Sequence, residues 1–369
     1  MSKYTLICPC HFGLESVLSS EVKRIGGQDV AAADGRVSFG GDDEMLAKSN
    51  IWLRTAERVL IKLGEFEAVS FTELFDNVKE IHFEDYIGKN DAFPVKGWSI
   101  NSRLQSVPAC QSIIKKAIVE RMKDHYKISR FAETGPIHAI QFSIHKNIVT
   151  VMLDTSGIGL HKRGYRKVSN LAPIKETLAA GLVDLAHVKR DSMVYDPFCG
   201  SGTIVIEAAM KAKNIAPGLK RSFLFEQWGI MDKNIVTETR MKALSSIIHD
   251  ADFAGFGMDI SQEAVNLSSI NAKTAGVNSA VSFRKSEIND FTASEDIIVI
   301  TNPPYGERML EISLSEELYK VMGTRFSQAG CKAYVISPHE QFEKLYGTAA
   351  AKRRKLYNGM IKCQYYMYY

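Results

Sequence analysis

The sequence contains no apolar run approaching the roughly 18 residues of a membrane-spanning helix, which excludes a helical membrane span. Its 6 cysteines are scattered over 369 residues, so they do not form the dense disulfide framework of a small secreted domain. The first residues, MSKYTLICPC, carry a single lysine and no long apolar segment, unlike a secretory signal. These absences together predict a cytoplasmic protein with reduced thiols and no membrane partner.

Metal-binding patterns are also missing. Cys8 and Cys10 are separated by one residue instead of the two of a CxxC pair, and His11 is the only further ligand type beside them. The remaining histidines show no HxxxH or similar ligand spacing. We therefore interpret Cys8–His11 as the end of a strand leading into a helix, and we expect no metal site.

Neither sign of charge dominates, because 46 Lys and Arg residues stand against 42 Asp and Glu residues, for a net charge of +4. A total this small does not by itself indicate nucleic-acid binding. The chain is 45% hydrophobic and 24% charged, which is close to the average of globular proteins and excludes a disordered or fibrous chain. Its length predicts two or three domains. No apolar surplus or coiled-coil pattern indicates an obligate interface, so we expect a monomer.

The spacing of apolar residues predicts two differently organised halves. The first is an α+β region over 1–155, with helices at 13–25, 71–77 and 110–122 and strands at 4–8, 35–39, 98–102, 137–145 and 148–154. From Ser192 on, strands and helices alternate, which is typical of a mainly parallel, doubly wound sheet. Its strands are expected at 193–196, 253–259, 280–284, 297–301 and 332–337, and its helices at 203–211 and 262–274. Asn358-Gly359 between two alternating runs predicts a hairpin whose last strand is antiparallel.

The first chemical motif is Asp196-Pro197-Phe198-Cys199-Gly200-Ser201-Gly202-Thr203, which follows a predicted strand and begins a helix. Glycines allow a tight turn close to a ligand, and a helix N-terminus offers unpaired N–H groups. Neither GxxxxGKS/T nor GxGxxG is present, whereas Asp196 favours a ligand with a cationic amino group, such as the methionine part of S-adenosylmethionine. The residues assigned to this cofactor are Asp196, Cys199, Gly200, Gly202 and Thr203. The alternative is a strand–helix turn without a ligand.

Two later strand ends carry further carboxylates. Asp259, within the sequence GMDI, is placed to accept hydrogen bonds from ribose hydroxyls, although a strand-end aspartate can also cap a helix. After the next strand, we expect Glu287 to accept the adenine amino group while Ile288 packs on the ring. Asp290 is the alternative acceptor, and Ile260 is assigned to the same cofactor site.

The third motif, Thr301-Asn302-Pro303-Pro304-Tyr305-Gly306, follows another predicted strand. Its prolines restrict the backbone so that the Asn302 side-chain oxygen and the Pro303 carbonyl can face one spot. Two acceptors there can hold an amino group on a planar base, and Tyr305 offers a ring for stacking. We assign catalysis to Asn302, Pro303 and Tyr305, with Asn302 also contacting the cofactor. Such a site acts by positioning and electrostatics, without a strong base.

The sequences DPFCGSGT, GMDI and TNPPYG, in this order, resemble the S-adenosylmethionine-dependent amino-methyltransferases. The stretches 160–166 and 172–180 are similar to the THUMP-domain guanine-N2 methyltransferases of ribosomal RNA, and 102–118 resembles a THUMP core. The resemblance implies a ferredoxin-like domain over 1–60, a THUMP RNA-binding domain over 61–155 and a Rossmann-like class I methyltransferase domain over 156–369. It also implies methylation of the exocyclic N2 of guanine in RNA, most readily 23S ribosomal RNA.

Positive charge is concentrated in two places that suit an RNA substrate. No acidic residue lies between Asp154 and Glu176, and a basic run with an aromatic residue suits a phosphate backbone and an unstacked base. The residues expected to bind RNA are Lys162, Arg163, Tyr165 and Arg166 in this stretch, and Lys115 and Lys116 on the helix over 110–122. A solvated linker and an ordinary polar helix face are the alternatives. A further run over 352–355 is more consistent with a solvated surface.

Other functions remain open on the residues alone. Some ribosomal members of the family carry a second methyltransferase domain, whereas this sequence stops at Tyr369, so transfer RNA is an alternative target. The Asn-Pro-Pro-Tyr motif also suits adenine, which makes a DNA adenine-N6 methyltransferase the next alternative. An RNA-binding protein with a vestigial methyltransferase fold is disfavoured by the intact motifs. A nicotinamide oxidoreductase is disfavoured by the missing GxGxxG and by the hairpin.

Overall fold

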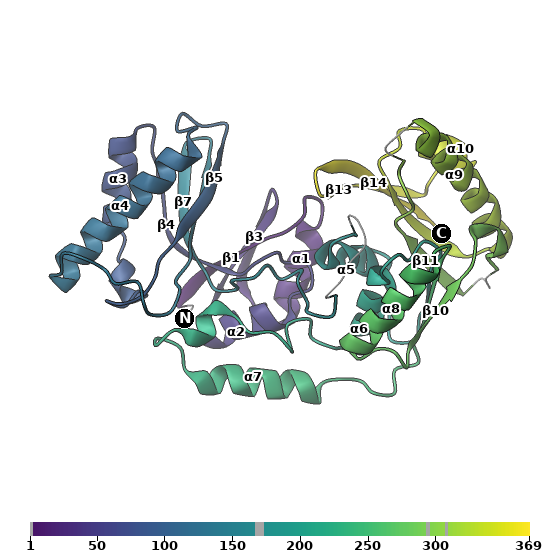
Figure 1. Cartoon of the computed structure of the whole chain (residues 1–369), viewed down its shortest axis with the longest axis horizontal. Coiled ribbons are helices and arrows are strands. Elements are labelled where there is room, and N and C mark those ends of the chain that lie inside the picture. The colour runs from purple at the N-terminus through teal and green to yellow at the C-terminus, as the bar shows by residue number, and fades with distance from the viewer. Residues whose placement is uncertain (1–2, 167–172, 293–295, 307–308) are drawn as a thin grey trace.

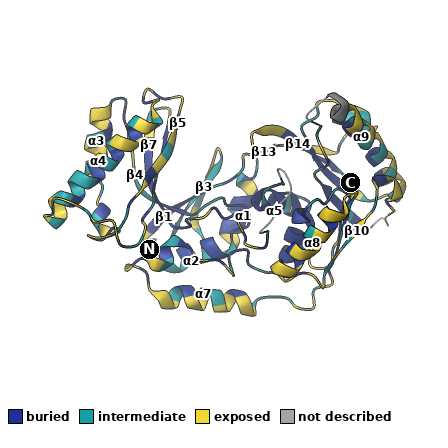
Figure 2. Ribbon diagram, viewed as in Figure 1, coloured by how far each residue is buried: buried dark blue, intermediate teal, exposed yellow. Residues whose placement is uncertain are grey.

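The computed structural model describes residues 3–166, 173–292, 296–306 and 309–369. Within these ranges the chain forms two seven-stranded sheets, one in each half of an elongated molecule (Figure 1). Buried residues follow the strands and the inner faces of the helices (Figure 2). No helix in the described ranges has both the length and the apolar character to traverse a lipid bilayer.

The N-terminal sheet is continuous from residue 4 to residue 154, in the order β2-β3-β1-β4-β7-β6-β5. Its strands are β1 (Tyr4–Pro9), β2 (Gln28–Ala33), β3 (Arg36–Gly41), β4 (Leu60–Glu67), β5 (Val95–Ile100), β6 (Ile140–His145) and β7 (Ile148–Asp154). Its helices are α1 (Glu15–Arg24), α2 (Asp43–Trp52), α3 (Phe71–Lys79), the short η1 (Phe83–Asp85) and α4 (Val107–Tyr126). Strand β4 pairs antiparallel with both β1 and β7. One apolar core therefore extends through the whole N-terminal half.

Helix α4 shows how local sequence sets the ends of these elements. The Ser106 hydroxyl accepts the Ala109 N–H at 3.4 Å and so satisfies a donor at the helix start. The helix ends where Lys127 takes a left-handed φ of 54°, since the ladder of hydrogen bonds cannot continue there. One face of α4 is buried, and it consists of Cys110, Ile114, Ala117, Ile118 and Met122.

The C-terminal sheet has the order β10-β9-β8-β11-β12-β14-β13. Its strands are β8 (Met193–Asp196), β9 (Ala254–Asp259), β10 (Val281–Lys285), β11 (Ile297–Thr301), β12 (Lys332–Ser337), β13 (Lys352–Asn358) and β14 (Ile361–Tyr368). Its helices are α5 (Glu176–Leu185), α6 (Thr203–Ala212), α8 (Gln262–Ala275), α9 (Met309–Ala329) and α10 (Phe342–Tyr346), with short turns η2 (Leu224–Gln227) and η3 (Ile288–Asp290). Strands β8 to β12 pair in parallel, whereas β14 is antiparallel to β12 and β13. The predicted Rossmann-like sheet with its C-terminal hairpin is confirmed.

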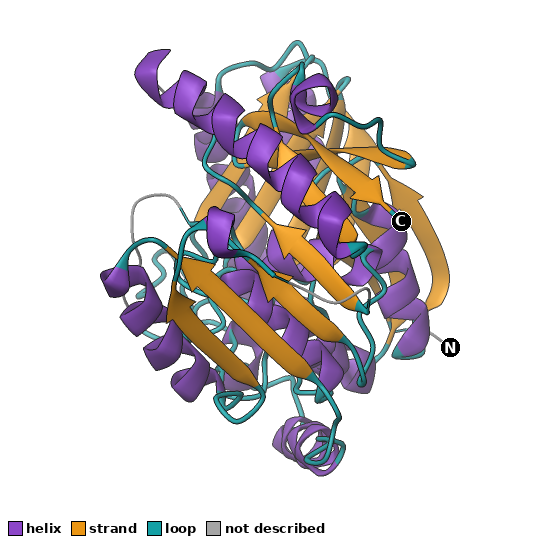
Figure 3. Ribbon diagram, turned by 90° about the vertical axis from the view of Figure 1, so that its right-hand side faces the viewer, coloured by secondary structure: helices purple, strands orange, loops and turns teal. Residues whose placement is uncertain are grey.

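Alternate residues of the parallel strands supply two cores, one on each face of this sheet (Figure 3). Val194 and Ile300 pack with α5, α6 and α8. Their neighbours Tyr195 and Val299 pack with α9 and α10 on the other face. Because side chains alternate along a strand, a parallel sheet covered on both faces needs apolar residues at nearly every strand position.

Several contacts join the halves of the molecule, and two of them involve elements that are far apart in the sequence. Residues 216–243, which include most of α7 (Lys233–Ser245), leave the second sheet and pack into the N-terminal core. Within this excursion Trp228 stacks on His138, with ring centroids 4.7 Å apart. On the other side of the junction, the Arg354 guanidinium of β13 donates to the Gly13 carbonyl at 2.7 Å. Gly13 has φ +91°, and a Cβ there would lie 2.3 Å from the Lys355 carbonyl oxygen, so the loop before α1 packs directly on the hairpin.

We expect Gly13→Ala to lower the free energy of unfolding more than Gly347→Ala. The two glycines have φ of +91° and +89°, so both substitutions carry the left-handed backbone cost of about 1–2 kcal/mol. A Cβ at residue 347 meets no atom within 4 Å, whereas one at residue 13 collides with the hairpin backbone. Urea unfolding followed by circular dichroism compares the two variants. Equal losses would contradict the tight packing of loop and hairpin.

Candidate active site

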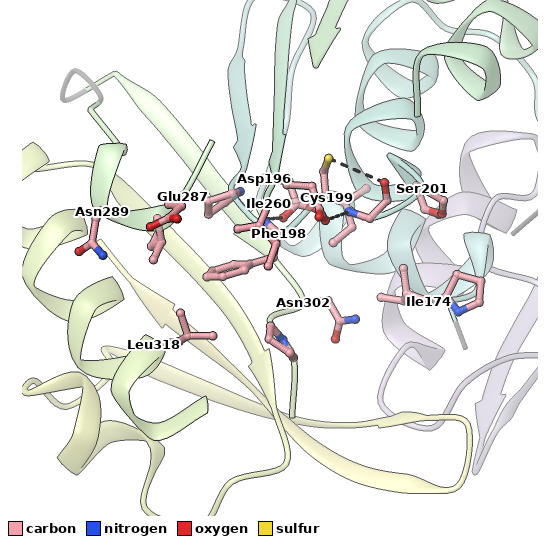
Figure 4. A pocket seen from close by; sticks show the side chains of 18 residues that line it. Ile174, Asp196, Phe198, Cys199, Ser201, Ile260, Glu287, Asn289, Asn302 and Leu318 are labelled. Carbon is pink, nitrogen blue, oxygen red and sulfur yellow. Dashed lines mark hydrogen bonds between the residues drawn. The ribbon is translucent and has the colours of Figure 1, made fainter. Parts of the chain in front are cut away.

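A cavity of about 550 Å³ opens beyond the carboxyl ends of β8, β9 and β11 (Figure 4), the edge of a parallel sheet at which ligands bind. Nine of the predicted residues line it: Asp196, Cys199, Gly200, Thr203, Asp259, Ile260, Glu287, Ile288 and Asn302. In Figure 4 the side chains of Glu287 and Asn289 lie toward one end and Ile174 toward the other, with Asn302 across from the Asp196–Cys199 loop. The predicted cofactor residues thus come together around one cavity.

The glycine loop between β8 and α6 is held by the neighbouring strand and helix. The Gly200 N–H donates to the Asp259 carboxylate at 3.0 Å, and the Ser268 hydroxyl donates to the Gly200 carbonyl at 2.8 Å. Gly202 precedes α6 with φ +77°, and a Cβ there would lie 3.0 Å from the Phe283 ring. Gly202 does not line the cavity. Gly202 lets the loop turn against β10, and its predicted contact with the cofactor stays a prediction.

Asp196 is a buried carboxyl at the base of the cavity. It accepts the Thr301 hydroxyl at 2.7 Å and the Phe198 N–H at 3.1 Å. Burial raises the pKa of Asp196 to about 7, and the nearby Asp259 carboxylate also raises it. Both hydrogen bonds favour the ionised form but do not offset the loss of water around it. A cationic amino group entering the cavity would supply the missing positive partner.

Two further carboxylates, Asp259 and Glu287, line the same cavity. Asp259 accepts the Gly200 and Ser261 N–H groups through its two oxygens, at 3.0 and 2.9 Å, and each oxygen keeps a lone pair for a ligand. Glu287 and Ile288 line the cavity, whereas Asp290 does not, and the Asp290 carboxylate lies 3.5 Å from the Ser286 hydroxyl. Of the two alternatives for the adenine contact, the structure brings Glu287 to the cavity.

The residues of the Asn-Pro-Pro-Tyr segment lie in part where they were expected and in part elsewhere. Asn302 and Pro304 line the cavity, while Pro303 is buried behind them. Tyr305 does not face the cavity. Its hydroxyl donates to the Asn302 side-chain oxygen at 2.5 Å and accepts from the Asn358 amide of the hairpin at 3.2 Å. The predicted stacking of the target base on Tyr305 stays a prediction, and in this structure the hairpin holds the Tyr305 hydroxyl through Asn358.

The predicted RNA contacts of Arg163 and Tyr165 are also wrong. The side chain of Arg163 is 2% exposed and forms an ion pair with Glu207, whose side chain is 0% exposed, at 3.5 Å. The buried Tyr165 hydroxyl donates to the same carboxylate at 3.0 Å. Both residues are internal because Glu207, in the middle of α6, needs partners where no water reaches it.

Arg166 is engaged at the edge of the cavity instead of facing solvent. Its guanidinium pairs with Glu176 at 2.9 Å and donates to the Thr203 hydroxyl at 3.1 Å and to the Ile174 carbonyl at 2.9 Å. Its side chain is 7% exposed, so its predicted contact with RNA is wrong. Arg166 instead connects two residues that line the cavity.

The three predicted lysines divide into one that is paired and two that are exposed. The Lys115 ammonium binds the Glu133 carboxylate at 2.7 Å and the Phe93 carbonyl at 3.0 Å, which reduces its availability for phosphate. Lys116 and Lys162 are exposed. Their contact with RNA stays a prediction.

Several residues of the site were missed by the sequence analysis. Ile174 follows a proline within the stretch that carried the family resemblance, and Ser201 lies inside the first motif, so both could have been named. Leu318 comes from α9, which carries no motif, and nothing in the sequence would have found it. In the described part of the chain, no group of three or more His, Cys, Asp or Glu side chains could hold a metal ion.

Models of known protein families match nearly the whole chain. Residues 163–367 match the family model of an RMKL-like methyltransferase domain. Residues 5–60 match an RlmL ferredoxin-like domain, and residues 68–154 match a THUMP domain. These matches agree with the predicted order of folds.

Two curated relatives are similar over most of this chain. YpsC of Bacillus subtilis, which is provisionally named an RNA methyltransferase, is 41% identical over 373 residues, covering 100% of this chain and 97% of that protein. The ribosomal RNA large subunit methyltransferase K/L of Psychromonas ingrahamii is 32% identical over 366 residues. The match covers 96% of this chain but 49% of that relative.

Three solved structures share the fold throughout. A possible methylase of Clostridium difficile 630 has a TM-score of 0.96 and 44% identity, covering 99% of this chain and 97% of that one. A Listeria monocytogenes protein described as a predicted N6-adenine-specific DNA methylase has a TM-score of 0.93 and 42% identity, covering 99% and 96%. SMU.472, described as a methyltransferase and solved in complex with SAH, has a TM-score of 0.93 and 38% identity, covering 100% and 98%.

We expect the buried Asp196 carboxyl to make the stability of the ligand-free protein depend on pH. Its pKa is about 7 in the folded chain and about 3.9 when unfolded, so the folded chain holds the extra proton between these values. The free energy of unfolding therefore falls as pH rises from about 4 to 7, by about 1.4 kcal/mol per unit from this group. Urea unfolding of wild type and Asp196→Asn at pH 5 and pH 7.5 isolates the effect. A difference between the two proteins that does not change with pH would contradict it.

Proposed function

This chain belongs to the RMKL-like methyltransferase family, and on that premise we propose that it transfers a methyl group from S-adenosylmethionine to the exocyclic N2 of a guanine in RNA. We propose 23S ribosomal RNA as the substrate. The observation that carries the proposal is the meeting of the Asp196 and Asn302 side chains at one cavity, in a chain that also carries a THUMP domain.

The cavity suits S-adenosylmethionine at both ends. The buried Asp196 carboxyl is matched to the cationic amino group of the methionine part. Asp259 is matched to the ribose hydroxyls, and Glu287 with Ile288 to the adenine amino group and ring. When bound, this cofactor supplies an electrophilic methyl group on a sulfonium centre. The SAH bound in SMU.472 supports the same assignment.

The catalytic contribution of the chain is the orientation of an amino group by Asn302. The Tyr305 hydroxyl occupies one lone pair of the Asn302 side-chain oxygen and fixes which end of the amide is the acceptor. The second lone pair can accept an N–H of the guanine amino group. That hydrogen bond directs the nitrogen lone pair toward the methyl group, and the nitrogen releases a proton to solvent after the new N–C bond has formed. The acceleration comes from positioning and electrostatic stabilisation, without a strong base.

The three parts of the chain have different functions in this proposal. We propose that residues 1–60 and 61–155 hold the RNA, with Lys116 among the contacts, and that residues 156–369 carry out the transfer as a monomer in the cytoplasm, with Lys162 as a further RNA contact at the start of this range. A guanine of transfer RNA is an alternative acceptor for the same site. DNA adenine is a second candidate, which the description of the Listeria monocytogenes structure favours.

We expect Asn302→Ala to abolish methyl transfer while leaving the affinity for S-adenosylhomocysteine within a few-fold of wild type. The reason is that Asn302 contacts the acceptor, whereas the carboxylates hold the cofactor. Tritiated-methyl transfer to ribosomal RNA, transfer RNA and DNA from cells lacking the gene, followed by nucleoside analysis, measures the activity. N2-methylguanosine from ribosomal RNA supports the proposal. N6-methyladenine in DNA, or loss of binding and transfer together in the variant, contradicts it.

We expect Glu287→Ala to weaken S-adenosylhomocysteine binding about tenfold, and Asp290→Ala to leave it unchanged. A hydrogen bond to a charged group contributes about 1.5–3 kcal/mol, and only Glu287 lines the cavity. Titration calorimetry of both variants gives the two affinities. A larger loss in the Asp290 variant would reverse the assignment of the adenine contact.

A further inference from the structure

A second cleft lies where the N-terminal half meets the hairpin. We call it the hairpin cleft; it has a volume of about 860 Å³. Its walls come from the loop before α1, the start of α5 and the turn between β13 and β14. The residues that line it include Phe12, Glu57, Lys175, Lys355, Tyr357 and Met360.

The hairpin cleft adjoins the reaction cavity on two sides. Ile174 lines the reaction cavity and the next residue, Lys175, lines the hairpin cleft. At the hairpin turn, Asn358 donates to the Tyr305 hydroxyl, which in turn donates to Asn302 in the reaction cavity. A chain that enters one of these spaces therefore passes beside the other.

The cleft exposes apolar side chains to solvent. Phe12 is 55% exposed and Met360 is 96% exposed. The Phe12 and Tyr357 rings lie edge to face, with centroids 6.0 Å apart. The Lys355 ammonium lies 5.5 Å from the centre of the Tyr357 ring and is exposed to solvent. Aromatic rings beside a lysine are the pattern with which proteins hold unpaired nucleotides.

The charges that line the cleft favour the binding of an uncharged base over the binding of a free anion. Glu57 is compensated by His11 at 3.2 Å, His161 at 3.4 Å and Lys175 at 3.2 Å. The Glu15 carboxylate accepts two backbone N–H groups, from Gly13 and Gly35.

Asp34 also lines the cleft and is exposed. The lining of the cleft thus holds three carboxylates, of Glu15, Asp34 and Glu57, and two lysines, Lys175 and Lys355, so it has no excess of positive charge to attract phosphate alone. Stacking on its rings is the stronger source of affinity, with Lys355 placed for one phosphate.

We propose that the hairpin cleft binds the nucleotide next to the target guanine in unpaired RNA, with its base stacked on one of the two rings of Phe12 and Tyr357 and in contact with the edge of the other. This inference rests on the proposed RNA substrate. A base that enters a closed cavity must leave its stack, and its neighbour then loses a stacking partner. The rings of the cleft replace that partner and hold the strand in the open form that the reaction cavity requires.

The test uses the full chain and a fluorescein-labelled 12-nucleotide unpaired RNA of mixed sequence, with its duplex as comparison. Phe12→Ala and Tyr357→Ala should each weaken single-strand binding about tenfold, since one base–aromatic stack contributes roughly that factor. Affinity for the duplex and for S-adenosylhomocysteine should stay within twofold.

Three further variants serve as controls. Tyr357→Phe and Phe12→Trp keep a ring and should retain single-strand affinity. Tyr369→Ala removes an aromatic side chain that is 61% exposed after β14, is not part of the cleft and lies outside residues 1–155, and should change nothing. Loss of affinity in Tyr357→Phe equal to that in Tyr357→Ala would overturn the stacking proposal.

The outcomes separate this inference from the proposed function. If wild type makes N2-methylguanosine and the Phe12→Ala, Tyr357→Ala double variant keeps its single-strand affinity and its KM for RNA, the cleft proposal fails and the function stands. If the double variant loses single-strand binding but wild type methylates no RNA, the cleft is an RNA site and the proposed reaction fails. Ultraviolet crosslinking of 4-thiouridine RNA to peptides containing Phe12 or Tyr357 provides direct support for the cleft.

Discussion

The buried carboxylate of Glu207 is the constraint on which the relation between the two halves depends. It lies in α6, the helix that begins at the glycine loop, and its partners Arg163 and Tyr165 come from the segment that leaves the N-terminal sheet. Arg163 also donates to the backbone carbonyl of Arg54 in the N-terminal half. Removing one partner of such a buried pair typically costs about 3–5 kcal/mol, because the other charge is left without compensation. The helix that follows the glycine loop is thereby held to the N-terminal half of the chain.

Local features of this molecule could be predicted from the sequence, because each depends on a few consecutive residues. The strand–loop–helix at Asp196–Thr203, the hairpin at Asn358-Gly359 and the cavity contact of Glu287 all belong to this class. The role of the basic run after Asp154 could not be predicted in this way. A count of charges does not show that Glu176 and Glu207, further along the chain, supply partners for its arginines.

Features that depend on contacts between distant segments could not be predicted from the sequence. The excursion over 216–243 joins the N-terminal core, although the chain on both sides of it belongs to the second sheet. Its apolar residues carry no sign of which half they will pack on. The motif containing Tyr305 and the hairpin turn containing Asn358 were each recognised, but the hydrogen bond between them was not. That contact joins the motif to the hairpin turn, between residues that are far apart in the sequence.

Strand β4 is shared by the ferredoxin-like and THUMP parts, since it is paired on one side to β1 and on the other to β7. A shared strand cannot act as a hinge, so the N-terminal half behaves as an arm of constant length. For an enzyme that holds RNA with this arm, the distance between the bound part of the RNA and the reaction cavity is fixed by the length of the arm. Among the many guanines of a folded RNA, all alike in their chemistry, the arm would then select the one that lies at that distance from the grip.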